Sequence, residues 1–145
     1  MPKSEVKSGL YLFEKLKDMK TLLIDDDEWI RDAMTLFFEG EGCHLLAVET
    51  AEKGMKMLDT QHYDVIIADY RLPGMDGLDF FGRIKESQSE ALTVLITAYG
   101  SKTVLSKAAE LGIMGFIDKP FTIEMLEDTL SGLLERKHNP LAQKV

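Results

Sequence analysis

Five short apolar runs alternate along the chain with segments whose apolar residues recur at helical spacing. The apolar runs are residues 21–24, 44–48, 64–68, 92–97 and 115–117. The segments with helical periodicity are residues 28–40, 51–60, 77–86, 101–111 and 122–136. Five β–α units in order predict an α/β fold, and the continuously apolar runs are typical of parallel strands covered on both faces. Right-handed crossovers then give a five-stranded, doubly wound parallel sheet.

The composition limits the class of protein. The chain has 145 residues, of which 45% are apolar, and this is enough for one domain with one good core. A net charge of −8 argues against a general binder of nucleic-acid backbones and fits a site for cations. The apolar stretches are too short to span a bilayer, and no apolar segment of a secretory signal is evident. We therefore expect a cytoplasmic protein without a membrane span. Its one cysteine, Cys43, is expected to be a small buried residue on a strand.

Three carboxylates follow the first apolar run directly: Asp25, Asp26 and Asp27. Like charges repel at this spacing, and burial would favour their neutral forms, so something must compensate the charge. In a sheet of order 2-1-3-4-5, ligands bind where the carboxyl ends of strands one and three meet. Asp69 directly follows the third run, at the end of the expected strand, so Asp25, Asp26 and Asp69 are expected in one crevice. Carboxylates with a backbone carbonyl and water are what Mg²⁺ (or Mn²⁺) prefers.

Two further groups are expected at the same edge. The fourth run ends in Thr97, and the fifth leads into Lys119. A metal ion, an ammonium group and a hydroxyl donor around one carboxylate can accept a phosphoryl group, because phosphoryl transfer depends on positioning and charge neutralisation.

The same residues carry a family resemblance. The motifs DDD after the first strand, ADYRLPGMDG, ITAYGS and GFIDKPF occur in the order and near the spacing of response-regulator receiver domains, and the chain resembles that family over about residues 20–136. The resemblance implies a flavodoxin-like sheet of order 2-1-3-4-5, as in chemotaxis response regulators. It implies a signalling switch and not an enzyme in the ordinary sense: a phospho-acceptor that catalyses its own phosphorylation and slow autodephosphorylation.

The resemblance also implies roles for residues around the acids. Asp69 resembles the phospho-acceptor, Asp26 the direct metal ligand, and Asp25 the acid that acts partly through metal-bound water. The backbone carbonyl of Arg71 resembles the third protein ligand of the metal. The side chains of Arg71 and Tyr99 occupy positions that tune the lifetime of the phosphoryl group in this family.

A second set of roles concerns the response to phosphorylation. Thr97 resembles the switch hydroxyl and Lys119 the phosphate-pairing lysine. Pro120 resembles a proline that family members often hold in the cis form. Phe116 stands where the family keeps an aromatic rotamer switch, often Tyr, and it lacks the hydroxyl.

The implied partners are proteins. A sensor histidine kinase or a phosphotransfer protein would donate the phosphoryl group to Asp69. The altered surface of the fourth and fifth helices would bind a downstream protein or a second copy of the chain. No DNA-binding module is evident in the sequence, so no direct contact with nucleic acid is expected.

Two alternatives remain at this point. Asp25-Asp26-Asp27 also satisfies D-x-D, the nucleophile loop of haloacid-dehalogenase-type phosphatases, with Asp25 as nucleophile and Asp27 as acid/base. Trp29 departs from that family's loop, which has Thr or Val there, and Asp69 would have no role. In the second alternative, the chain is the receiver portion of a longer transcription regulator or kinase.

Each site residue also has an ordinary structural interpretation. For Asp27 we favour the N-cap of the following helix. Trp29 is expected as a partly buried helix residue, close enough to the acids to report on them by fluorescence. Taken singly, Thr97 is typical of a β-branched strand residue and Lys119 of a solvated lysine. Phe116 taken singly is typical of a core aromatic. Their arrangement around Asp69 favours the site.

The N-terminal residues form a separate segment. Within residues 4–18, apolar side chains recur at helical spacing: Val6, Leu10, Phe13 and Leu16. We favour an amphipathic helix packed on the domain or on another subunit; a membrane or partner-binding helix and a true start at Met19 are the alternatives. The chain is thus divided into an N-terminal extension, a receiver domain and a short tail: residues 1–19, 20–137 and 138–145.

Overall fold

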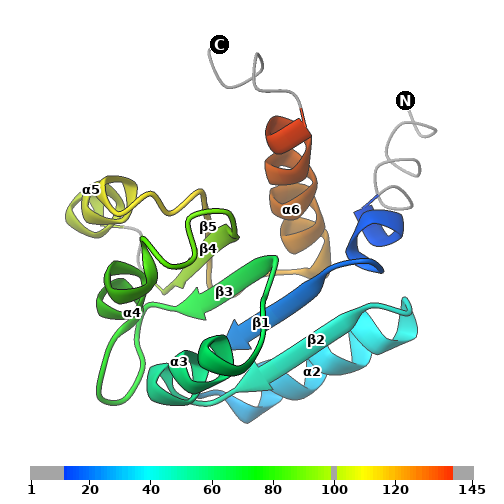
Figure 1. Ribbon diagram of the computed structural model, residues 1–145, viewed down its shortest axis with the longest axis horizontal. Coiled ribbons are helices and arrows are strands. Elements are labelled where there is room, and N and C mark those ends of the chain that lie inside the picture. The colour runs from blue at the N-terminus through cyan, green and yellow to red at the C-terminus, as the bar shows by residue number, and fades with distance from the viewer. Residues whose placement is uncertain (1–11, 99–100, 139–145) are drawn as a thin grey trace.

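The computed structural model describes residues 12–98 and 101–138, which form one parallel sheet with helices on both faces (Figure 1). The strands are β1 (Lys20–Ile24), β2 (His44–Val48), β3 (Val65–Asp69), β4 (Leu92–Thr97) and β5 (Gly115–Asp118). The helices are α2 (Glu28–Gly40), α3 (Ala51–Thr60), α4 (Gly77–Ile84), α5 (Lys102–Glu110) and α6 (Ile123–His138). The strand order β2-β1-β3-β4-β5 confirms the predicted doubly wound α/β fold.

Successive side chains of each strand point to opposite faces of the sheet, so the interior has two hydrophobic cores, one on each face. Val65 and Ile67 of β3 point to one core, which α2 and α6 cover, and Ile66 and Ala68 point to the other, which includes residues of α3, α4 and α5. Because all four side chains are fully buried, β3 has no polar face, as expected for the central strand of a parallel sheet. The layers place the carboxyl ends of all five strands at one edge, away from the N-terminal helix (Figure 1).

Polar side chains cap the helices that flank this edge. Asp27 accepts a hydrogen bond from the backbone N–H of Trp29, which confirms its expected role at the start of α2. Ser101 caps α5 by accepting a hydrogen bond from the backbone N–H of Val104. Each such cap typically contributes about 1 kcal/mol, so the loops that carry site residues are anchored to their helices.

The described part of the N-terminal segment packs on the domain. Residues 12–16 are helical, and Leu12, Phe13 and Leu16 are buried in the core beneath α2 and α6. The ring of Phe13 meets that of Phe37 edge-on, with 5.3 Å between the centroids. The favoured interpretation, a helix that packs on the domain, is confirmed for these residues.

Val6 and Leu10 lie outside the described residues. Cys43 is buried as expected, but it precedes β2 and is not part of the strand, so that detail of the prediction was wrong. Its thiol lies 3.6 Å from the carbonyl oxygen of Phe13, where the N-terminal helix covers it.

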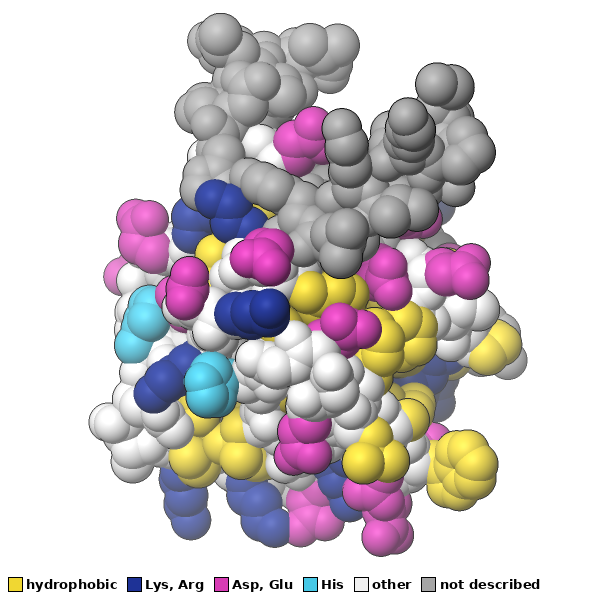
Figure 2. All heavy atoms as spheres, turned by 90° about the vertical axis from the view of Figure 1, so that its right-hand side faces the viewer, with side chains coloured by type: hydrophobic (Ala, Val, Ile, Leu, Met, Phe, Trp, Pro, Cys, Tyr) yellow, Lys and Arg dark blue, Asp and Glu magenta, His cyan; other side chains and the backbone are white. Residues whose placement is uncertain are grey.

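One face of the surface is visible in Figure 2, on the side of the molecule where the N-terminal helix lies. Lysine and arginine side chains there are interspersed with acidic and apolar ones, so the described part of this face carries no continuous basic stripe. Within the described residues, no helix is long and apolar enough to cross a bilayer.

If the N-terminal helix is part of the core, Leu16→Ala should lower the free energy of unfolding by about 2–4 kcal/mol, because it leaves a cavity among buried side chains. Glu14→Ala is the matched control, since Glu14 lies on the exposed side and makes only a surface ion pair with Lys17. Urea unfolding followed by circular dichroism measures both. Equal stability of the two variants would show that the helix contributes little to the fold.

Candidate functional site

Three carboxylates meet at the carboxyl edge of the sheet. In the pairing of β1 with β3, Ile24 lies opposite Ala68, so the next residues, Asp25 and Asp69, emerge side by side. One carboxylate oxygen from each of Asp25, Asp26 and Asp69 lies within 4.8 Å of the others. Asp25 and Asp69 are buried, whereas Asp26 is exposed. The predicted acid cluster is therefore present.

Lys119 provides a positive charge inside this cluster. Its Nζ donates a hydrogen bond of 2.8 Å to Asp69 Oδ2 and lies 3.2 Å from Asp25 Oδ2. Burial of Lys119 opposes its charge, but the hydrogen bond to Asp69 and the nearby charge of Asp25 outweigh burial and raise the pKa of the ammonium group. Lys119 is thus held in its charged form against the acids.

The environment of Asp25 disfavours its charge. Burial raises the pKa of Asp25, and the negative charge of Asp69 raises it further, while the Asp27 N–H and Lys119 act in the opposite direction. Asp25 Oδ1 accepts the Asp27 N–H at 2.9 Å. Asp25 Oδ2 is buried, and within the described residues no hydrogen bond reaches it besides the ionic contact with Lys119.

These groups fit a hard divalent cation. One lysine faces three carboxylates, so the cluster keeps an excess of negative charge, and Asp25 Oδ2 has unused acceptor capacity. Asp26 opens onto a hollow of about 460 Å³, lined also by Tyr70, Arg71 and Asp76, with room for the waters that Mg²⁺ retains. The donor set is of the kind that could hold a hard divalent cation.

Two residues that the sequence interpretation did not single out support the cluster. Arg31, one turn into α2, donates from Nη1 to the backbone carbonyl of Asp25 at 2.9 Å and so fixes the acidic loop. Gly77 begins α4, and a Cβ there would overlap the carbonyl oxygen of Asp69. Gly77 lies within the motif ADYRLPGMDG, which was the available signal; Arg31 had none beyond its nearness to the acids.

Thr97 ends β4 with a fully buried side chain. Its hydroxyl donates a hydrogen bond of 3.0 Å to Asp118 Oδ1 on the neighbouring strand. In the register of β4 and β5, Leu95 lies opposite Phe116 and Thr97 opposite Asp118, so Thr97 and Phe116 lie on the same face of the sheet. The Phe116 side chain is 37% exposed.

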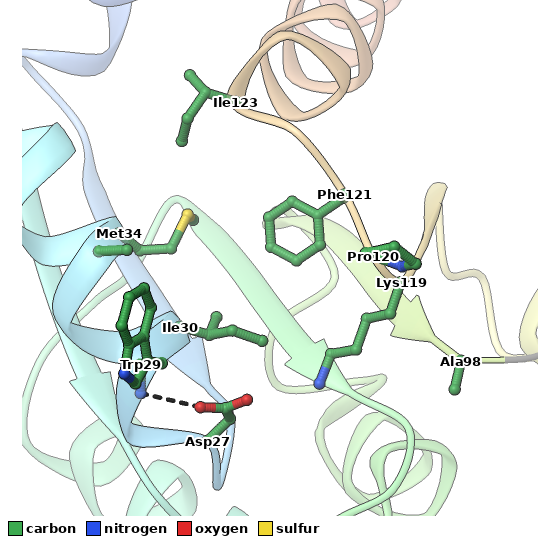
Figure 3. A pocket seen from close by; sticks show the side chains of 10 residues that line it. Asp27, Trp29, Ile30, Met34, Ala98, Lys119, Pro120, Phe121 and Ile123 are labelled. Carbon is green, nitrogen blue, oxygen red and sulfur yellow. Dashed lines mark hydrogen bonds between the residues drawn. The ribbon is translucent and has the colours of Figure 1, made fainter.

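A hollow of about 680 Å³ adjoins the cluster between α2 and the start of α6 (Figure 3). Lys119 reaches from its wall toward the end of β3, while Trp29, Met34 and Phe121 supply apolar surface. Trp29 is 85% exposed, so the expectation of a partly buried residue was wrong. The core-facing stripe of α2 runs through Met34 and Phe38, and position 29 lies off that stripe.

The predicted residues are distributed as follows. The cluster unites Asp25, Asp26, Asp69 and Lys119, with Thr97 at the end of the next strand. Arg71 shares the smaller hollow with Asp26, and the role of its carbonyl stays a prediction. The Lys119–Pro120 peptide bond is cis. Tyr99 lies outside the described residues.

Comparison with known proteins gives a family match over most of the chain. The sequence model of the response regulator receiver domain matches residues 21–131. A probable chemotaxis protein CheY of Rhizobium etli is 30% identical over 79% of this chain and 92% of its own. Sporulation initiation phosphotransferase F of Bacillus subtilis is 28% identical over 83% of this chain and 97% of its own.

Solved structures agree with this match. The signal receiver domain of an HD domain-containing protein from Pseudomonas fluorescens is similar with a TM-score of 0.76 and 25% identity, over 83% of this chain and 97% of that chain. Some relatives are much longer. The chain spans 32% of a cyclic di-GMP phosphodiesterase of Thermotoga maritima, which is 29% identical over 82% of this chain.

Mg²⁺ binding should weaken on acidification at a higher pH than ordinary aspartates would give. Because burial raises the pKa of Asp25, protons compete with the cation for this carboxylate above the usual range. Affinity should be highest near neutral pH and should already fall before the pH reaches the range in which ordinary aspartates titrate. Calorimetric titration with Mg²⁺ at a series of pH values measures this, with Trp29 emission as a second readout.

The control for this titration is Asp26→Ala, which should bind Mg²⁺ weakly at every pH because it lacks the exposed carboxylate. A wild-type affinity that stays constant across the range would show that Asp25 does not contribute a charge to the cation site.

Proposed function

The chain belongs to the response regulator receiver domain family and is a phosphorylation-controlled signalling switch, and we propose that Asp69 is its phospho-acceptor. The observation that carries this proposal is the position of Asp69. It ends the central strand β3, accepts a hydrogen bond from Lys119 and lies against two other carboxylates. No other acid of the described residues combines these three features.

The transfer we propose moves a phosphoryl group from a phosphohistidine to an oxygen of Asp69. The P–N bond of the donor breaks, an O–P bond to the carboxylate forms, and the histidine leaves with the electron pair of the broken bond. Lys119 already contacts Asp69 Oδ2 at 2.8 Å, so a small movement lets its ammonium group follow the charge onto the phosphoryl oxygens. The buried surroundings strengthen this pairing.

A divalent cation would be held by Asp25, Asp26, Asp69 and the backbone carbonyl of Arg71. Receiver domains generally bind Mg²⁺ at such an acidic pocket, and we propose Mg²⁺, or Mn²⁺, here. When bound, it supplies neutralisation of the oxygen charge that develops during transfer. Arg31 keeps the Asp25 backbone in place for this role, and Gly77 lets α4 begin against the Asp69 carbonyl.

Receiver domains interact with histidine kinases or phosphotransfer proteins and with downstream effectors. We propose that the phosphohistidine-bearing donor docks on the hollow between α2 and α6. Lys119 belongs to this hollow and to the acid cluster, so a protein seated there can present its imidazole to Asp69. The exposed Trp29 and the apolar Met34 and Phe121 offer surface that such a partner would cover.

The response we propose runs through Thr97. A phosphoryl group adds about −1.5 to −2 charges and three acceptor oxygens near this hydroxyl. Thr97 then turns to donate to one oxygen, Phe116 turns inward on the same face, and the surface of α5 and α6 changes for a downstream protein or a second copy of the chain. The protein also catalyses its own phosphorylation and slow autodephosphorylation, with Arg71 and Tyr99 tuning the lifetime.

The dehalogenase-type phosphatase finds less support. Its acid/base would be Asp27, but an Asp27 oxygen accepts the Trp29 N–H as the N-cap of α2. Its nucleophile would be Asp25, which is fully buried beside Lys119. For the domain division we propose a receiver unit at 20–137, preceded by an N-terminal extension at 1–19, whose residues 12–16 pack on it, and followed by a short tail at 138–145. A role within a longer regulator or kinase remains a further proposal.

Asp69→Asn should abolish the mass increase of one phosphoryl group that acetyl phosphate and Mg²⁺ produce in the wild type, because the amide is a poor nucleophile. Intact-protein mass spectrometry measures the change. The matched control is Asp59→Asn, which removes an exposed acid of α3 and should be labelled like the wild type. Normal labelling of Asp69→Asn would place the acceptor elsewhere.

A further inference from the structure

The carboxylate of Asp118 accepts the one hydrogen bond that the Thr97 hydroxyl can donate. The bond, Thr97 Oγ1 to Asp118 Oδ1 at 3.0 Å, joins the last residues of two paired strands. A threonine hydroxyl has one hydrogen to donate, so it serves one acceptor at a time. While Thr97 donates to Asp118, it cannot donate to a phosphoryl oxygen on Asp69.

The position of Asp118 is unusual for its residue type. Aspartate is depleted in strands, yet Asp118 is the last residue of β5, with an exposed side chain. Within the described residues, the bond from Thr97 is the side-chain interaction of Asp118 that the structure shows. A carboxylate is also a stronger acceptor than a neutral group, which favours this bond over water.

The nearby aromatic residue cannot take over this role. Phe116 lies on the same face as Thr97 and Asp118, two residues before Asp118, and has no hydroxyl. In the unphosphorylated state, the partner of the Thr97 hydroxyl is instead the carboxylate of Asp118. Release of this bond frees both the Thr97 hydroxyl and the strand face that Phe116 shares.

We propose that Asp118 is a positioning residue that holds Thr97 in the unphosphorylated orientation and so sets how readily the switch turns on. The inference rests on the proposed function, because it takes Asp69 as the acceptor. Phosphorylation would exchange one charge-assisted hydrogen bond of Thr97 for another. The switching equilibrium is then governed by the difference between the two acceptors and not by the phosphoryl group alone.

The test compares variants by the affinity for beryllofluoride with Mg²⁺, a mimic of the acyl phosphate, and by amide NMR of α5 and β5. Asp118→Ala removes the competing acceptor, so beryllofluoride should bind about threefold to tenfold more tightly, the scale of one hydrogen bond. In the same variant, resonances of α5 and β5 should shift part of the way toward their activated positions without any ligand.

Two controls separate the hydrogen bond from the charge. Asp118→Asn keeps a carbonyl oxygen that can accept from Thr97 but loses the charge, so its gain in beryllofluoride affinity should be clearly smaller than that of Asp118→Ala. In the background of Thr97→Ala, Asp118→Ala should have no further effect. Suppose that Asp118→Asn and Asp118→Ala bind beryllofluoride more tightly by the same factor, and that this gain persists when Thr97 is also replaced by alanine. Asp118 would then act by charge repulsion, and the proposal would be wrong.

Failure of this inference can be told from failure of the proposed function. Intact mass after acetyl phosphate shows whether the wild type and each variant accept one phosphoryl group. If the wild type and Asp118→Ala are labelled but bind beryllofluoride equally, only the role of Asp118 is overturned. If Asp69→Asn is labelled like the wild type, the proposed function fails. Asp118→Val, which suits a strand and has no acceptor, replaces Asp118→Ala if that variant does not fold.

Discussion

The ion pairing of Lys119 with Asp69 and Asp25 is the interaction on which the site depends. Without it, two buried carboxylates and a third exposed one would face each other at the edge of the sheet with no opposing charge. Lys119 compensates part of this charge, and burial still raises the pKa of Asp25. The folded state therefore binds a proton at Asp25 more tightly than the unfolded chain, so ionised Asp25 opposes folding at neutral pH. This opposition weakens as the pH falls through the raised pKa of Asp25, and it is absent below the pKa that Asp25 has in the unfolded chain.

The same arrangement explains how a small chemical change reaches the surface. The acids, Lys119 and Thr97 come from the ends of β1, β3, β4 and β5, and the side chains of β3 and most of those of β1 and β4 are buried. A charge placed on Asp69 therefore acts on a few side chains that can rotate, while the backbone of the sheet stays fixed. The N-terminal helix packs at the far edge, where it can stabilise the core without touching the site (Figure 1).

Much of this could be predicted from the sequence because it follows from periodicity and from strand ends. The five strands and helices follow from the alternation of apolar runs, whereas the sheet order was implied by the family resemblance. Given that order, the meeting of Asp25, Asp26 and Asp69 follows from their places at the strand ends. The exposure of Trp29 was missed because adjacent residues on a helix point in directions that differ by a large angle. Position 29 therefore lies off the buried stripe of Met34 and Phe38. The Thr97–Asp118 bond depends on the register of β4 with β5 and on side-chain rotamers, which apolar patterns do not determine.

The central claim is that Asp69 carries the phosphoryl group, and covalent trapping tests it most directly. The protein is phosphorylated with Mg²⁺ and a phosphoryl donor and then treated with borohydride, which reduces an acyl phosphate of aspartate to homoserine. Digestion and mass spectrometry locate the altered residue. The account predicts homoserine at position 69 and unmodified aspartate at positions 25, 26 and 27. Homoserine at position 25, with Asp69 unchanged, would contradict it.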